Sequence, residues 1–135
     1  MTATFSPIEA TQATGGRWTA GAEDSVLRGV YTDTRQPKPG ALFVALKGPN
    51  YDAHDFLAQV AEQGAAAAMV EESFLAAHPE AARGGIPLLA VRDTLQGLGD
   101  LARFWRHHCH AVRTIAITGS VGKTTVKEML ASVLR

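Results

Sequence analysis

Short apolar runs recur along the chain and predict buried strands. The runs Ala41–Leu46, Ala65–Val70 and Pro87–Val91 are mostly apolar and are bounded by glycine, proline or polar residues. Such short continuous runs are typical of strands that are buried inside a sheet. Leu27–Thr34 is rich in β-branched and aromatic residues and predicts a further strand, which a turn at residues 37–40 closes.

Helix signals alternate with these runs. Ser6–Glu9 has the form of a capping box and predicts a short helix to about Thr14. Asp52 is suited to be the N-cap of a helix over residues 53–63, with Gly64 as the residue that follows its end. Alternating strands and helices predict an α/β fold.

A longer amphipathic helix is predicted near the end of this pattern. Asp93 or Thr94 caps it, and it ends near His108. Residues 73–85, between two predicted strands, show no clear period and are expected to be irregular. The helix carries a stripe at helical spacing that is expected to face the core, formed by Leu95, Leu98, Leu101, Ala102 and Trp105.

A glycine-rich loop follows residue 113. The segment Thr114–Thr125 reads TIAITGSVGKTT and leads into an amphipathic stretch, which is the strand, glycine turn and helix that surround a phosphate-binding loop. Ile117 stands where the strict pattern has a glycine, so the loop is a shortened variant. The alternative is an ordinary strand-to-helix turn with a chance Gly-Lys-Thr.

The loop predicts binding of ATP and magnesium. Lys123 is placed for the β- and γ-phosphates and is the candidate catalytic residue, while the Thr124 hydroxyl is the natural magnesium ligand. The residues expected to bind the nucleotide are Gly119, Ser120, Val121, Gly122, Lys123, Thr124 and Thr125. Because only Val126–Arg135 follow, we expect residues 113–135 to begin a truncated ATP-binding domain after a first domain at residues 1–112. We expect this chain alone to be inactive and to bind ATP weakly.

Composition narrows the classes of function. The sequence is 46% hydrophobic and 19% charged, and its 13 basic residues balance 13 acidic ones, so no global field favours nucleic acid. Cys109 is the single cysteine, which fits a reducing compartment. No apolar run is long enough to span a bilayer, and the cytoplasm is expected. His107, His108 and His110 are interpreted as a helix end, not as a metal site.

Four segments together resemble the amino-terminal part of the Mur ligases, in order and spacing, across about Val26 to Leu134. They are Thr32–Arg35, Pro39–Leu46, Asp52–Phe56 and Thr118–Met129. The resemblance implies a small mixed-sheet amino-terminal domain that binds a UDP-precursor, followed by the first strand, P-loop and helix of a P-loop ATPase domain. It also implies an ATP-dependent ligase of peptidoglycan synthesis, which forms an amide bond through an acyl phosphate.

Within the family, Asp-Ala-His at 52–54 and Val-Lys-Glu-Met at 126–129 look most like the member that joins D-alanyl-D-alanine to UDP-N-acetylmuramoyl-tripeptide. The full-length protein is expected to be a monomer. One alternative is the related ligase that adds the third amino acid to the dipeptide precursor. Others are a non-catalytic nucleotide-sugar-binding module and an unrelated P-loop phosphotransferase, although the latter leaves the upstream motifs unexplained.

The resemblance implies a UDP-sugar site without fixing its contacts. The candidate residues are Thr34, Arg35, Lys47, Asp52 and His54. Hydroxyl, carboxylate and imidazole groups can hydrogen-bond uracil and ribose, and the two cations can meet the diphosphate. The structural alternatives are that Asp52 only caps a helix and that Arg35 only pairs with Asp33.

Overall fold

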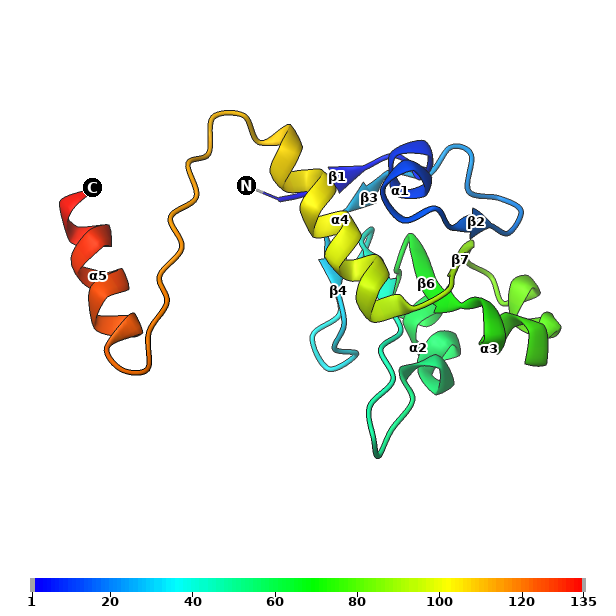
Figure 1. The fold of residues 1–135 in the computed structure, drawn as a ribbon. Coiled ribbons are helices and arrows are strands. Elements are labelled where there is room, and N and C mark those ends of the chain that lie inside the picture. Colours follow the sequence, from blue (N-terminus) through cyan, green and yellow to red (C-terminus); the bar gives the residue numbers. More distant parts are fainter. Residues whose placement is uncertain (1, 135) are drawn as a thin grey trace.

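A five-stranded mixed sheet forms the centre of the computed structural model, which describes residues 2–134 (Figure 1). Its strand order is β2-β7-β6-β5-β4, in which β4 to β7 run parallel and β2 lies antiparallel to β7. The strands are β2 (Arg17–Trp18), β4 (Val30–Tyr31), β5 (Leu42–Val44), β6 (Ala67–Glu71) and β7 (Leu88–Val91). The predicted α/β fold with a mixed sheet is confirmed.

Helices cover both faces of this sheet. Side chains alternate along β5, so Leu42 and Val44 face one core and Phe43 faces the other. The first core is covered by α1 (Pro7–Thr14) and α4 (Thr94–His108), and the second by α2 (Leu57–Glu62) and α3 (Glu72–Ala77). Burial on both faces explains why the strands appear in the sequence as continuous apolar runs.

The predicted strand over Leu27–Thr34 forms as two short strands. Gly29 adopts a φ of 96°, in the left-handed region that favours glycine, and divides β3 (Leu27–Arg28) from β4. β3 pairs antiparallel with β1 (Thr4–Phe5) in a separate two-stranded sheet, whereas β4 joins the main sheet beside β5. The apolar pattern therefore located extended chain but did not reveal the change of partner at Gly29.

The helix caps agree with the sequence. Ser6 and Glu9 form the complete capping box, with the Ser6 N–H donating to Glu9 Oε2 at 2.8 Å. Asp52 accepts a hydrogen bond from the His54 N–H, although the first turn is a 3-10 helix (Ala53–Phe56) before α2 begins. Asp93 caps α4 by accepting from the Gln96 N–H at 2.8 Å.

Two expectations about the second half of this domain are wrong. Residues 73–85 are not irregular, because α3 and a 3-10 helix (Pro79–Arg83) fold there. The residues of α4 that face the core also differ from the predicted apolar stripe. Leu101 is 1% exposed as expected, but Leu95 is 68% exposed, and the buried positions of the first turns are Thr94 and Gly97.

Gly97 lets α4 approach the sheet closely. A Cβ there would lie 2.7 Å from Sδ of Met69, which is fully buried, whereas a Cβ at Gly99 in the same helix would meet nothing within 4 Å. We expect Gly97→Val to lower the free energy of unfolding by about 1–3 kcal/mol through overpacking. The same change at Gly99 should stay within about 0.5 kcal/mol. Urea denaturation of both variants checks this, and equal losses would contradict the packing of α4 on β6.

The end of the chain stands apart from the sheet. After α4 ends at His108, residues 112–119 form neither helix nor strand, and they lead to α5 (Lys123–Val133), away from the body (Figure 1). The predicted strand before the P-loop is therefore wrong for this structure, because in the described chain no neighbouring strand pairs with it.

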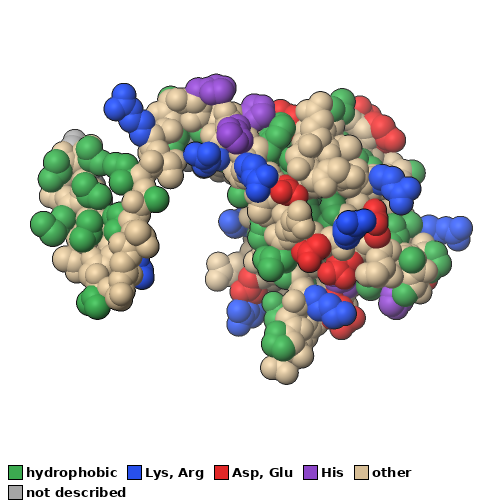
Figure 2. All heavy atoms as spheres, viewed as in Figure 1, with side chains coloured by type: hydrophobic (Ala, Val, Ile, Leu, Met, Phe, Trp, Pro, Cys, Tyr) green, Lys and Arg blue, Asp and Glu red, His purple; other side chains and the backbone are tan. Residues whose placement is uncertain are grey.

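Apolar side chains of α5 are accordingly open to solvent. Val126 is 44% exposed and Met129 is 64% exposed, and hydrophobic side chains cover much of α5 in Figure 2. Among residues 2–134, no helix combines the length and apolarity needed to cross a bilayer.

Candidate functional site

The four parallel strands end at one edge of the sheet, and the candidate residues for the UDP-sugar follow two of them. Thr34 and Arg35 come after β4, while Lys47, Asp52 and His54 come after β5. Because β4 and β5 are parallel neighbours, both segments leave the sheet at the same edge, where Figure 1 shows them as two protruding loops. Open α/β sheets bind ligands outside the carboxyl ends of their strands, so the structure brings these five residues to an edge suited to a ligand.

The loop after β5, residues 47–52, is closed at its base. Lys47 and Asp52 form an antiparallel bridge, and the Ala53 N–H donates to the Leu46 carbonyl at 3.0 Å. Tyr51 within the loop is 58% exposed. Tyr51 is not among the residues predicted from sequence, although an aromatic residue in a polar loop is a usable signal for stacking on a base.

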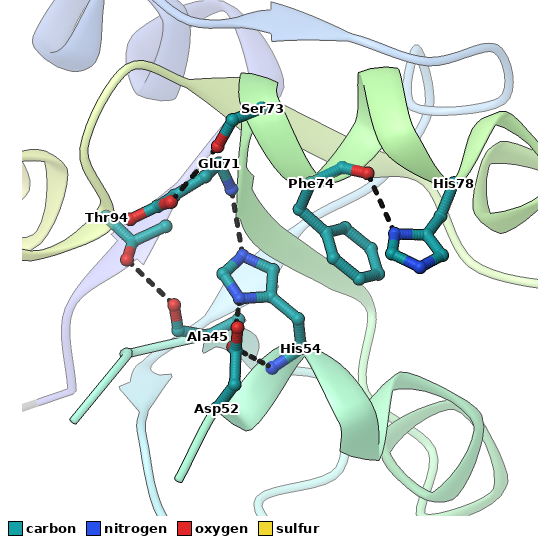
Figure 3. A network of polar contacts seen from close by, with 8 residues as sticks. All are labelled: Ala45, Asp52, His54, Glu71, Ser73, Phe74, His78 and Thr94. Atoms are coloured by element: carbon teal, nitrogen blue, oxygen red, sulfur yellow. Dashed lines mark hydrogen bonds and ion pairs between the residues drawn. The ribbon is translucent and has the colours of Figure 1, made fainter. Parts of the chain in front are cut away.

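His54 lies beneath this loop and is 3% exposed. Its Nδ1 is 2.5 Å from Asp52 Oδ1, and its Nε2 accepts a hydrogen bond from the Glu71 N–H at 3.0 Å (Figure 3). Since a backbone N–H can only donate, Nε2 carries the lone pair and Nδ1–H donates to Asp52. Both ring nitrogens are engaged, so a direct contact between His54 and a ligand would have to break one of these bonds.

Asp52 keeps one oxygen for other partners. Oδ1 accepts from both the backbone N–H and the ring of His54, and these contacts leave Oδ2 unused. Burial alone would raise the pKa of Asp52, but the hydrogen bonds from His54, together with the positive charge of Lys47, outweigh it and hold the pKa below 3.8. Asp52 is thus both the helix cap that the sequence suggested and an available carboxylate.

After β4, Arg35 is held by its neighbour Asp33. The guanidinium donates from Nε to Oδ1 at 2.9 Å and from Nη2 to Oδ2 at 2.8 Å. The ion pair anticipated as a structural alternative is therefore present, while the Arg35 side chain remains 86% exposed. Thr34 is half-buried, and its carbonyl accepts from Gln63 Nε2 at 3.0 Å, which ties this loop to the end of α2.

Asp33 is expected to titrate near pH 2. The side-chain hydrogen bonds of Arg35, followed by its backbone N–H, lower the pKa of Asp33 from 3.8 to about 2. Because the folded-state value is depressed, the pair stabilises the fold fully above pH 3.8 and loses this contribution as the pH falls through about 2. Carboxyl 13C NMR checks the value. Arg35→Ala should return the pKa of Asp33 toward 3.8, and Lys38→Ala should leave it unchanged. An ordinary pKa of Asp33 in the wild type would contradict the paired hydrogen bonds from the Arg35 guanidinium.

The predicted phosphate-binding loop, residues 119–125, has features that suit a phosphate. Gly119 and Gly122 take positive φ values of 152° and 81°, and Gly122 precedes the first turn of α5 without a side-chain cap, so the first amides of α5 are free to bind an anion. Lys123 Nζ donates to the Gly119 carbonyl at 2.7 Å across the loop.

The remaining residues of this predicted loop are open to solvent. Ser120, Val121, Thr124 and Thr125 are all exposed, and the Thr124 hydroxyl lies in the first helical turn, where a magnesium ligand is required. These residues fit a phosphate chain and a magnesium ion. The structure does not bring this loop together with the edge at β4 and β5, because α5 stands apart (Figure 1).

His108, the last residue of α4, makes contacts that explain it structurally. His108 Nδ1 is 2.9 Å from the Phe104 carbonyl, and the ring lies over Phe104 with the centroids 4.1 Å apart. Across residues 2–134, no group of three or more potential metal ligands is found.

Comparison with known proteins gives consistent similarities. A family model described as "Mur ligase family, catalytic domain" matches residues 26–106. The UDP-N-acetylmuramoyl-tripeptide--D-alanyl-D-alanine ligase of Haemophilus influenzae is 44% identical over 115 residues, which cover 85% of this chain and 23% of that protein. The enzyme of the same name from Escherichia coli is 45% identical over 111 residues, covering 82% of this chain and 23% of that protein.

The chain is also similar to a second type of ligase and to a solved structure. The UDP-N-acetylmuramoyl-L-alanyl-D-glutamate--2,6-diaminopimelate ligase of Bacillus licheniformis is 35% identical over 117 residues, or 86% of this chain and 22% of that protein. A crystal structure of MurF from Acinetobacter baumannii superposes with a TM-score of 0.84 at 36% identity, covering 98% of this chain and 28% of that one. The chain thus spans about a quarter of the length of the relatives it matches.

Proposed function

The chain belongs to the Mur ligase family, and from this premise we propose that it is the amino-terminal part of a UDP-N-acetylmuramoyl-tripeptide:D-alanyl-D-alanine ligase. Residues 1–112 form the domain that holds the UDP end of the precursor, and residues 113–135 begin the ATP-binding domain. The observation that carries the proposal is the edge where β4 and β5 end, because the two segments that carry the five candidate residues leave the sheet there, at the place where α/β sheets bind nucleotides.

Within this edge the side chains have distinct roles. The exposed cations Lys47 and Arg35 meet the diphosphate, and the free Oδ2 of Asp52 accepts from ribose or uracil. Tyr51 offers a ring on which uracil can stack. Of the two cations, Lys47 is the more available, since the Arg35 guanidinium already pairs with Asp33.

The P-loop supplies the second half of the proposal. ATP would supply the phosphoryl group that converts the peptide carboxylate into an acyl phosphate, with ADP as the leaving group. The amine of D-alanyl-D-alanine would then form the amide bond with loss of phosphate and of the amine proton. Lys123 and the amides at the start of α5 would neutralise charge on the phosphates, and the Thr124 hydroxyl would hold the magnesium ion. This is positioning and electrostatic stabilisation without a covalent bond to the protein.

The choice of family member rests on the degree of similarity. The D-alanyl-D-alanine ligases named above are more similar to this chain than the diaminopimelate ligase is. The proposal therefore includes a tripeptide precursor and a D-alanyl-D-alanine partner, a monomeric whole ligase and a cytoplasmic location.

Calorimetric titration of the 135-residue chain tests this proposal. We expect UDP-N-acetylmuramoyl-tripeptide to bind more tightly than the dipeptide precursor, and UDP-glucose to bind more weakly than either, because it shares only the UDP end with the muramoyl precursors. A preference for the dipeptide would favour the ligase that adds the third amino acid. Equal affinity for UDP-glucose would favour a general nucleotide-sugar-binding module, and absence of binding would contradict the placement of the site in residues 1–112.

A further inference from the structure

Apart from Tyr31, the polar or charged residues buried among residues 2–134 are His54 and Thr94, and both lie at the base of the 47–52 loop. Thr94, 2% exposed, donates from Oγ1 to the Ala45 carbonyl at 2.7 Å, just before the loop starts. His54, 3% exposed, lies just after the loop ends. Figure 3 shows the contact of Thr94 with Ala45 and, beside it, the contacts of His54 with Asp52 and Glu71. Buried polar groups are costly unless they are hydrogen-bonded, so both contacts are specific features of this edge.

His54 is fixed in orientation as well as in place. Its two in-plane nitrogens bind Asp52 and the Glu71 N–H, which sets the tautomer. The flat face of the ring stacks on Phe74 with the centroids 4.6 Å apart, and His78 stacks on the other side of Phe74 at 4.6 Å. The imidazole therefore cannot rotate without losing one of these contacts.

These bonds connect two different strands. Asp52 closes the loop after β5 through its bridge to Lys47, whereas Glu71 is the last residue of β6. The connection through His54 attaches the end of the loop to the neighbouring strand, while Thr94 attaches its start to α4. The loop that carries Lys47 and Tyr51 is thus held at both ends by buried side chains.

We propose that His54 is a positioning residue: it ties the 47–52 loop to the end of β6 and so orders the loop for the UDP end of the precursor, without touching the ligand. The inference rests on the proposed function. A loop that is already ordered loses less conformational entropy on binding. Removing the tie should weaken precursor binding by about 10-fold, the effect of leaving roughly one residue to be ordered by the ligand.

Two substitutions separate the two bonds. His54→Asn retains a donor near the position of Nδ1, and His54→Gln places an amide oxygen near the position of Nε2. His78→Asn is the matched control, because this exposed histidine stacks on the same Phe74 but binds neither Asp52 nor Glu71.

The first readout needs no ligand. We expect amide hydrogen exchange at Gly48 and Ala53 to accelerate in both His54 variants, because each breaks one of the two bonds of the tie. Exchange at Glu71 should accelerate in His54→Asn, which has no acceptor near the position of Nε2, and all three amides should stay unchanged in His78→Asn. In the wild type, long-range 1H–15N spectra should show a proton on Nδ1 and none on Nε2. Unchanged exchange in a folded variant, or a proton on Nε2, would overturn the tie even if neither variant bound any ligand.

The second readout is calorimetric binding of UDP-N-acetylmuramoyl-tripeptide. The His54 variants should bind about 10-fold more weakly, with the affinity of His78→Asn equal to that of the wild type. Weaker binding with unchanged exchange would instead make His54 a direct contact and overturn the inference. Failure of the wild type to bind would overturn the proposed function, which is a different result.

Discussion

Lys123→Ala is expected to lower amide ligation by about 100- to 1,000-fold in a whole Mur ligase that carries this segment. Lys123 is the first residue of α5, and its ammonium group already reaches across the loop to the Gly119 carbonyl. On the proposed function, replacing it removes a charge at the place where negative charge develops on the transferred phosphoryl group. The measurement is phosphate release in the presence of the tripeptide precursor and D-alanyl-D-alanine.

Lys127→Ala is the matched control for this experiment. Lys127 lies one helical turn further along α5, is exposed and pairs with Glu128 at 2.8 Å, so its loss should leave the rate within about twofold of the wild type. Equal activity of Lys123→Ala and the wild type would contradict the assignment of residues 119–125 as a phosphate-binding loop.

Leu101→Ala is expected to lower the free energy of unfolding by about 2–5 kcal/mol. Leu101 is 1% exposed and belongs to the core that also contains Phe5 and Met69, so truncation leaves a cavity between α4 and the sheet. For a domain of this size the loss corresponds to a fall in the thermal midpoint of about 10 °C or more. Circular dichroism during heating measures it.

Leu95→Ala tests the same helix from its exposed side. The sequence places Leu95 and Leu101 in one stripe, but Leu95 is 68% exposed and its truncation should change stability by no more than about 0.5 kcal/mol. Similar losses of stability in Leu95→Ala and Leu101→Ala would mean that the predicted stripe, which includes Leu95, faces the core, and would contradict the observed packing of α4.

The parts of the fold that the sequence predicted are those fixed by local chemistry. The capping box at Ser6 and Glu9 satisfies its own helix end, and the runs in β5, β6 and β7 are apolar because both faces of the sheet are covered. The break at Gly29 was missed because it depends on a change of strand partner. Leu95 was misplaced because the position of α4 is set by Thr94 and Gly97, a small polar residue and a glycine that carry no apolar signal.

The same distinction applies to the candidate site. Motifs identified Thr34, Arg35, Lys47, Asp52 and His54, and the parallel sheet places them at one edge. The pair of Asp33 with Arg35 was anticipated as an alternative, because the two residues are close in sequence. The sequence could not show that both nitrogens of His54 are engaged, since the second bond comes from Glu71, 17 residues away. The strand before the P-loop was predicted from its β-branched residues, but a strand forms only where a neighbour pairs with it.

The most direct test of the central claim is to map the UDP site by NMR. In 1H–15N spectra of the 135-residue chain, addition of UDP-N-acetylmuramoyl-tripeptide should shift the amide signals of residues 32–36 and 47–54, which leave the sheet at the ends of β4 and β5. Signals of α1 and of the far end of α4 should stay in place. Saturable shifts confined to another surface, such as the face covered by α2 and α3, would contradict the account.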